Sequence, residues 1–170
     1  MALLVPAQPR LASQNSHEKS FVFFLNTTHR QVNLYWMDFY GFQDFFTTLK
    51  PGAGIKANTF VTHPWIFRDA QTGERMHVKH QDIFWPQLYR VKNAGQLLPC
   101  RKLIAIHLPV TPTLRSRCLW VIAQHIYGDN ANGVLENMAL PRTLHNDLNS
   151  ILELIEKHKS MGMQRSVQVF

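Results

Sequence analysis

Cysteine is scarce in this sequence, and long apolar runs are missing. The two cysteines, Cys100 and Cys118, cannot build a disulfide framework. No stretch approaches the length of a membrane span, and the first residues lack the basic start and long apolar region of a signal peptide. We therefore expect an intracellular protein in a reducing compartment.

Motifs of catalysis are missing as well. The sequence contains no HExxH, no CxxC and no glycine loop for phosphate. His77 and His80 are close in sequence, but positions i and i+3 of a strand point to opposite faces. Cys118 falls in an apolar helical pattern, where a thiol is usually inert. These observations predict a binding protein with no catalytic residues, no metal site and no cofactor.

Acidic residues are few: 18 lysines and arginines face 11 aspartates and glutamates, which gives a net charge of +7. The basic residues are scattered rather than adjacent, so nucleic-acid binding is disfavoured. Hydrophobic residues make up 45% of the chain and charged residues 17%, a balance typical of a folded globular protein. A basic surface that tethers protein cargo remains an alternative function.

Short predicted strands separated by turn signals occupy the first two thirds of the chain. Residues 31–37 alternate, with Val32, Leu34 and Trp36 on one face. Several such strands at close spacing predict an antiparallel β-sandwich. The expected strands are residues 21–25, 31–37, 45–49, 55–60, 65–69, 76–78, 83–85 and 103–108.

Residues 112–126 predict the first of several helices. Thr111 suits the N-cap, Pro112 the first helical position and Gly128 the end. At 100° per residue, seven side chains form one stripe roughly 160° wide, which exceeds the usual apolar face of a helix on one core. One part of such a stripe can pack within the same chain and the other part on a partner protein. Periodicity alone, however, favours a well-buried helix with no partner. The members are Leu114, Cys118, Leu119, Val121, Ile122, His125 and Ile126.

The remaining helices are shorter in the prediction. Residues 134–139 form the second, Pro141 opens a third, and Ser150 begins a fourth after a break at Asn149. The fold class is therefore α+β, an antiparallel β-sandwich domain followed by a small α-helical domain. We expect a flexible N-terminal segment at 1–19, the sandwich at 20–110, the helices at 111–159 and a flexible tail at 160–170. Helices totalling about 60 residues should lean on the sandwich or on a partner.

Five segments resemble the von Hippel–Lindau tumour-suppressor family, in the same order and between about Asn15 and about Leu148. In the last of them, Thr113-Leu114, Cys118 and Ile122 have the spacing of a BC box, the motif that binds elongin C. The pattern His63-x-Trp65-x-Phe67-Arg68-Asp69-Ala70 followed downstream by a BC box is a specific pairing. The segments are residues 24–26, 36–39, 49–54, 63–70 and 113–122.

The resemblance implies a non-catalytic substrate-recognition subunit of an elongin–cullin–RING ubiquitin ligase, located in the cytoplasm and nucleus. Its partners would be elongin C, elongin B and a cullin scaffold with its RING subunit. Its substrate would be the hypoxia-inducible factor α subunit, recognised through 4-hydroxyproline and directed to ubiquitylation and proteasomal degradation. The alternative is an elongin-linked adaptor or scaffold for microtubule- or matrix-related cargo, with no dependence on hydroxyproline.

The resemblance also assigns residues to sites. Elongin C would bind Thr113, Leu114, Arg117, Cys118 and Ile122. A cullin would bind Leu140, Pro141 and Leu144, although Pro141 fits an ordinary helix start equally well. The substrate would meet Asn15, His17, Trp36, Phe46, Asn58, Thr59, Phe60, His63 and Trp65.

The chemistry of the assigned pocket is consistent with hydroxyproline. A proline ring stacks on indole, and its hydroxyl needs the donor and acceptor that Thr59 and His63 would supply. On one straight strand these two residues would lie about 13 Å apart, so a bend is expected at residues 61–64. Phe46 stands where the best-known members have a tyrosine, which removes one hydrogen bond to the substrate. Thr59 replaces a serine and keeps the hydroxyl.

Overall fold

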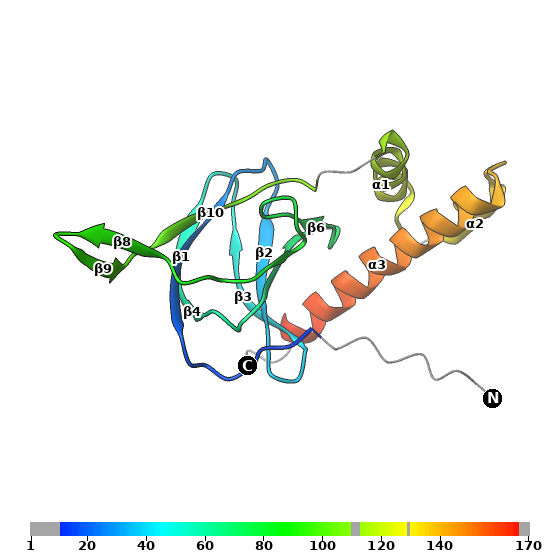
Figure 1. Ribbon diagram of the computed structural model, residues 1–170. Coiled ribbons are helices and arrows are strands. Elements are labelled where there is room, and N and C mark those ends of the chain that lie inside the picture. Colours follow the sequence, from blue (N-terminus) through cyan, green and yellow to red (C-terminus); the bar gives the residue numbers. More distant parts are fainter. Residues whose placement is uncertain (1–10, 110–112, 129, 167–170) are drawn as a thin grey trace, which may run out of the picture.

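The computed structural model describes residues 11–109, 113–128 and 130–166, with side chains up to Ser160. A β-rich part precedes three helices, and the last helix runs back to the β-rich part (Figure 1). The α+β class and the order of its two parts are thus confirmed. Among the residues that the structure describes, no helix combines the length and apolar character that a membrane crossing requires.

Two sheets form the sandwich. One has the strand order β10-β1-β4, and the other has the order β3-β2-β5-β6, with β7 also paired to β5. Pairing is antiparallel except between β1 and β10, which run parallel. The strands are β1 (Lys19–Asn26), β2 (Val32–Met37), β3 (Gln43–Leu49), β4 (Gly54–Phe60), β5 (Trp65–Asp69), β6 (Arg75–Met76), β7 (Ile83–Phe84) and β10 (Lys102–Ile106).

Alternation along the strands builds the core between the sheets. Val22 and Phe24 of β1 are fully buried, as are Val32 and Leu34 of β2. The ring of Phe24 lies at the centre, 5.0 Å from Trp65 and 5.3 Å from Phe67 between centroids. The predicted face of residues 31–37 is therefore correct. The opposite face is also covered, because Tyr35 and Met37 pack with Ile66, Ile83 and Leu11.

A hairpin that we did not predict projects from the sandwich (Figure 1). It consists of β8 (Arg90–Asn93) and β9 (Gln96–Pro99), joined by Ala94 and Gly95 with φ of +46° and +86°. Positive φ at both central residues suits the twist of a two-residue hairpin turn. All eight strand residues are exposed. The hairpin has no core-facing side, so its sequence carries no pattern of burial that predicts it.

The helices differ from the prediction at several boundaries. Helix α1 (Leu114–Ile126) begins two residues later than expected, and its N-cap is Thr113, whose hydroxyl accepts from Ser116 N–H at 3.3 Å. Thr111 and Pro112, which we placed at the cap and first position, lie outside the described residues. Helix α2 spans Ala131–Asn137.

Helix α3 (Arg142–Ser166) is one continuous helix, so the predicted break at Asn149 is wrong. Asn149 Nδ2 hydrogen-bonds with His145 and the Ser150 hydroxyl donates to the carbonyl of Asn146, contacts that hold both side chains along the helix. Helical structure also continues beyond residue 159, where we expected the helical domain to end.

The C-terminal half of α3 packs on the sandwich. His158 is buried, with Nε2 3.2 Å from the carbonyl oxygen of Ala70. Gly73 has φ +74°, and a Cβ at this position would lie 2.7 Å from His158 Cβ. Both the backbone conformation and the close approach therefore require glycine. The helical part thus packs on the sandwich through α3, as its small size led us to expect.

Candidate substrate-binding site and partner-binding face

A tight turn joins β4 to β5 and carries the predicted substrate residues. His63 N–H donates to the carbonyl of Phe60 at 3.1 Å, so the chain reverses over residues 60–63. The expected bend is confirmed. It brings His63 back toward the end of β4, where Thr59 is buried.

Aromatic rings surround this turn. Trp36 and Trp65 are directly paired across β2 and β5. His63 stacks on Trp36 with centroids 5.5 Å apart and an interplanar angle of 17°. Phe46 meets Trp65 edge-on at 5.2 Å. The structure thus brings four of the predicted aromatic and imidazole rings into one cluster at the end of the sandwich.

A β-bulge directs Phe46 to this cluster. Along the β2–β3 ladder, Leu34 pairs with Thr47 and Tyr35 pairs with Phe45, which leaves Phe46 as the extra residue of β3. Bulges bend a strand and redirect a side chain. Phe46 remains 41% exposed, so its ring forms an open wall rather than part of the core.

The polar groups of the cluster are held by specific bonds. Trp65 Nε1–H donates to Thr59 Oγ1 at 3.0 Å in a buried contact. Thr59 therefore acts as an acceptor there, and within the described residues no acceptor binds its hydroxyl hydrogen. His63 Nε2 hydrogen-bonds with the Ser16 hydroxyl at 2.9 Å.

Burial sets the protonation of His63. Desolvation lowers its pKa below the ordinary value, and a hydrogen bond with the backbone of Gln14 offsets part of this effect. The imidazole is therefore neutral at pH 7 and offers one N–H donor and one acceptor nitrogen.

The flanking predicted residues lie around the turn with different contacts. Asn58 is exposed, and its Oδ1 accepts from Arg101 at 2.8 Å. Phe60 is half-buried, with its ring centroid 5.0 Å from that of His63. Asn15 and His17 are exposed on the segment before β1, and the Asn15 carbonyl accepts from the Thr62 hydroxyl at 3.0 Å.

Three further residues belong to the cluster but were not predicted. Ser16 contacts His63, and Phe39 stands edge-on to both Trp36 (6.2 Å) and His63 (5.4 Å). Asp44 accepts from Trp36 Nε1 at 2.9 Å and fixes that indole. Phe39 lies within a segment that carries the family resemblance, whereas no sequence pattern marks Ser16 or Asp44.

The wide stripe of α1 is divided between two environments. Leu119 and Ala123 are buried in the core of the helical part. Leu114 is 78% exposed and Val121 54% exposed, and Cys118 is exposed as well. One edge of the stripe therefore packs in the core of the helical part, and the other edge is an apolar face that no other part of the described chain covers.

The other assigned partner residues belong to the helical part and differ in burial. Ile122, Leu140 and Leu144 are half-buried and pack against the helical core. Pro141 is exposed and immediately precedes α3. Arg117 is exposed on α1 and lines a small cavity toward the sandwich together with Arg30 and Glu74.

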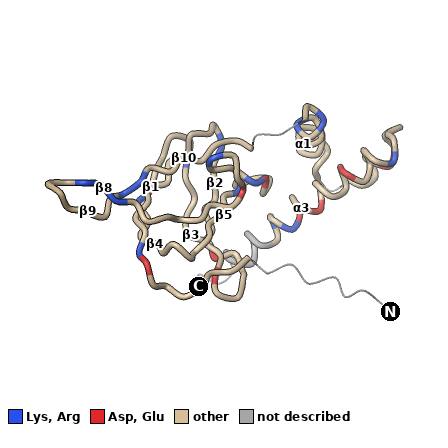
Figure 2. Tube along the Cα trace, viewed as in Figure 1, with Lys and Arg blue, Asp and Glu red and all other residues tan. Residues whose placement is uncertain are grey.

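Ion pairs within the sandwich border that cavity. Arg30 Nη1 lies 2.6 Å from Glu74 Oε2 and 3.6 Å from Asp69 Oδ2. Burial raises the pKa of Glu74, and the contact with Arg30 offsets this in part. Across the molecule, Lys and Arg are spread over both parts rather than gathered in one patch (Figure 2).

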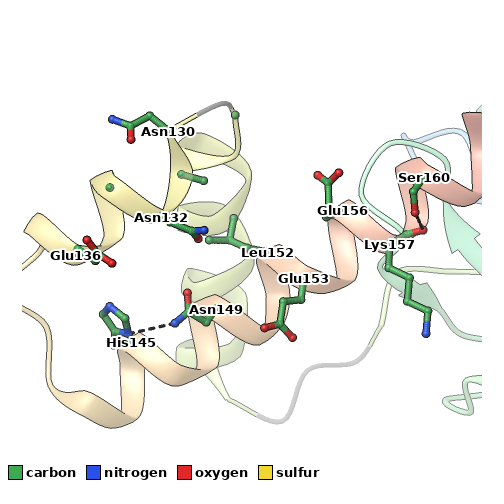
Figure 3. Close-up of a pocket in the computed structure, with 13 residues that line it drawn as sticks. Asn130, Asn132, Glu136, His145, Asn149, Leu152, Glu153, Glu156, Lys157 and Ser160 are labelled. Carbon is green, nitrogen blue, oxygen red and sulfur yellow. Dashed lines mark hydrogen bonds between the residues drawn. The ribbon is translucent and has the colours of Figure 1, made fainter.

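A separate cavity of about 850 Å³ lies between the α2 region and α3 (Figure 3). Its labelled lining residues are mostly polar, including His145, Asn149 and Glu153 (Figure 3). None of the residues assigned to the substrate, elongin C or a cullin lines it. The cavity is therefore distinct from both candidate binding regions.

These features define a class: an α+β protein whose β-sandwich carries an aromatic site at one end and precedes a small helical part with an open apolar face. A model of the VHL beta domain matches residues 11–92. The chain is 39% identical over 151 residues to "Protein Vhl" of Drosophila melanogaster, and the alignment covers 85% of this chain and 84% of that protein. The chain belongs to the VHL family.

Proposed function

We propose that this chain is the substrate-recognition subunit of an elongin–cullin–RING ubiquitin ligase, and that it recognises 4-hydroxyproline in the hypoxia-inducible factor α subunit. Family membership supports a VHL-like role in substrate recognition for a ubiquitin ligase. In this role the chain binds and presents substrate, and the transfer of ubiquitin belongs to other subunits. We place it in the cytoplasm and nucleus.

The observation that carries the proposal is the state of the Thr59 hydroxyl. Its oxygen accepts from the Trp65 indole, and its hydrogen has no acceptor among the described residues. A ligand hydroxyl at this position would accept from the Thr59 O–H while Thr59 keeps its bond from Trp65.

His63 supplies the second half of the recognition. The Ser16 hydroxyl already hydrogen-bonds with its Nε2 at 2.9 Å, which supports the view that this nitrogen can bind a hydroxyl. In the proposed complex the hydroxyproline hydroxyl replaces Ser16, while the pyrrolidine ring packs against the aromatic cluster. Unmodified proline would displace Ser16 without replacing its hydrogen bond. Sites built for a hydroxyl reject the analogue lacking it by up to about 10⁴–10⁵-fold.

The open face of α1 is the proposed elongin C contact. Leu114, Cys118 and Val121 present apolar or weakly polar side chains to solvent on successive turns. Burying a leucine side chain of this kind contributes about 1.5–3 kcal/mol. Leu140, Pro141 and Leu144 lie at the start of α3, where we propose that the cullin binds.

The decisive experiment titrates the chain, purified with elongins B and C, with two peptides that differ only in one proline hydroxyl. A large preference for the hydroxylated peptide is expected. Ser16→Ala should strengthen binding by about 2- to 13-fold, because the ligand then breaks no internal hydrogen bond worth about 0.5–1.5 kcal/mol. Equal binding of both peptides would reject hydroxyproline recognition and leave the elongin contact standing.

The alternative function is an adaptor for other cargo held by the basic surface. The net charge of +7 favours this alternative. A charge-driven contact weakens steeply with salt, whereas binding in an aromatic site changes little. Titration of the hydroxylated peptide at low and high salt therefore separates the two functions.

A further inference from the structure

Three histidines lie together at the edge of the sandwich, away from the substrate turn. The ring centroids of His80 and His107 are 5.3 Å apart, and those of His77 and His107 are 6.3 Å apart. We propose that His77, His80 and His107 bind one divalent transition-metal ion of the Zn²⁺ type. Imidazole nitrogen is a preferred ligand for such ions.

The backbone brings these histidines together by two devices. His77 and His107 form a bridge in which each N–H donates to the other residue's carbonyl at 2.9 Å. Lys79 and His80 then adopt φ of +52° and +65°, and the chain reverses between Val78 and Gln81. Left-handed backbone at two successive non-glycine residues is uncommon and is found at functional sites.

This reversal corrects our sequence-based argument about His77 and His80. We assigned them to opposite faces because we expected residues 76–78 to be a strand that leads on in extended form. The strand β6 ends at Met76, and the turn that follows folds His80 back over His107. The two side chains are therefore on the same side of the edge.

The ligand atoms are available for coordination. His107 Nδ1 lies 2.8 Å from the carbonyl oxygen of Leu108, and because a carbonyl only accepts, Nδ1 carries the hydrogen. In this tautomer the ring lone pair of His107 is on Nε2, which receives only a long 3.4 Å contact from the backbone N–H of His80. A backbone carbonyl on the opposite ring nitrogen is the usual support of a metal-binding histidine.

His77 provides a second available nitrogen. Its Nδ1 is buried and has no hydrogen-bond partner in the described part of the chain. A metal ion bound by this nitrogen would therefore break no hydrogen bond within the described residues.

The distances between the imidazole rings show which of the three histidines already have the spacing that a bound metal ion requires. With Zn–N of about 2.0–2.1 Å and tetrahedral angles, two coordinating imidazole centroids lie about 5.2 Å apart. The pair His80–His107 already has this spacing, whereas His77 must approach by about 1 Å. In line with this, no three potential ligands in the described residues are close enough to hold a metal as they stand. The proposed site is a histidine pair that closes on a third ligand.

The surroundings can complete the coordination. A cavity of about 600 Å³ is lined by His77, His80 and Asp82 among others. Asp82 is half exposed and 3.7 Å from Arg75, so its carboxylate can turn toward a cation. Bound metal would fasten the β6–β7 connection to the end of β10, directly before the segment that leads to α1.

The test uses the full chain, purified without a polyhistidine tag, titrated with Zn²⁺, Ni²⁺ and Mg²⁺. We compare the unchanged chain with His107→Gln, His80→Asn and the control His29→Gln, which replaces an exposed histidine in the β1–β2 loop. Asparagine tolerates the left-handed backbone at position 80. Long-range ¹H–¹⁵N spectra of the imidazole groups report which nitrogens bind.

We expect one equivalent of Zn²⁺ or Ni²⁺ to bind, with shifts of the His107 and His80 ring nitrogens, and Mg²⁺ to have no effect. His107→Gln and His80→Asn should each weaken binding by at least about 10-fold, and His29→Gln should not. Unchanged affinity in both site variants would overturn the proposal, since binding would then rest on Cys118 or other groups. If His107→Gln disturbs folding, the exposed His80→Asn decides the question alone.

Discussion

Thr59→Val tests the proposed recognition of hydroxyproline most directly. Valine has nearly the shape of threonine, so the change removes the hydroxyl with little change in packing at this buried position. Two contacts depend on that hydroxyl. One is the existing 3.0 Å bond from Trp65 Nε1–H, and the other is the proposed bond to the ligand.

The two contacts predict two separate magnitudes. Leaving the buried indole N–H without an acceptor should lower the free energy of unfolding by about 1–3 kcal/mol. In the complex, the ligand hydroxyl loses one of its two partners in a desolvated site. A cost of about 1–3 kcal/mol there corresponds to a loss of about 5- to 150-fold in the preference for hydroxylated over unmodified peptide.

The ratio of the two peptide affinities separates recognition from stability. A variant that is merely less stable loses affinity for both peptides in the same proportion, so the ratio stays constant. Thr59→Ser is the matched control, because it keeps the hydroxyl and removes only a methyl group. We would measure both dissociation constants by calorimetry and the free energy of unfolding by denaturant titration.

The reasoning is refuted if Thr59→Val keeps the peptide preference of the unchanged chain. Thr59 would then be a structural acceptor for Trp65 and nothing more. A loss of preference in Thr59→Ser as large as that in Thr59→Val would also count against the hydroxyl as the recognition group.

Three further predictions concern the partner face, the aromatic wall and pH. Leu114→Lys should abolish binding to elongin C, because it places an unpaired charge in an apolar contact. The control Leu154→Lys, at an exposed position on α3, should leave binding unchanged. Co-purification of the Leu114 variant with elongin C at the original yield would contradict the proposed contact. Phe46→Tyr should strengthen peptide binding by about 2- to 13-fold through one added hydrogen bond, and unchanged affinity would mean that the ring edge does not face the peptide backbone. Burial lowers the pKa of both His63 and His77, so below pH 6.5 the unfolded state binds more protons than the folded state. The free energy of unfolding should therefore fall as the pH drops below 6.5. Denaturant titrations at pH 7.5 and 5.5 should show this fall, and the fall should be smaller in His63→Gln and His77→Gln.

The sequence predicts most of the sandwich because burial imposes a period of two on its strands. Val32 and Leu34 of β2, for example, lie on the face that their alternation indicates. The bend before His63 is expected because the family resemblance assigns Thr59 and His63 to one pocket, and residues four apart cannot meet on a straight strand. Features without a burial pattern are missed. The exposed β8–β9 hairpin is one, and the continuity of α3 through Asn149 is another.

The candidate site is predicted only in part, for a physical reason. The family resemblance assigns Trp36 and Trp65 to one pocket, and the pairing of β2 with β5 places them opposite each other. Ser16 reaches His63 through a segment without regular structure, and such a contact between residues 47 positions apart has no local signal. The bulge that leaves Phe46 unpaired depends on the register of β3 against β2, which the sequence of either strand alone does not determine.

The position of Trp65 explains why the core and the site cannot be separated. One side of its indole packs on Phe24 in the core, Phe46 covers another part, and its N–H orients Thr59. Truncating such a residue costs about 3–5 kcal/mol, a large part of the 5–15 kcal/mol that holds a typical domain together. Loss of peptide binding in Trp65→Ala would therefore say nothing about recognition. Because the core indole occupies the acceptor side of Thr59, the hydroxyl hydrogen would be left for the proposed ligand, and specificity for a hydroxylated ring would arise from the packing of the sandwich itself.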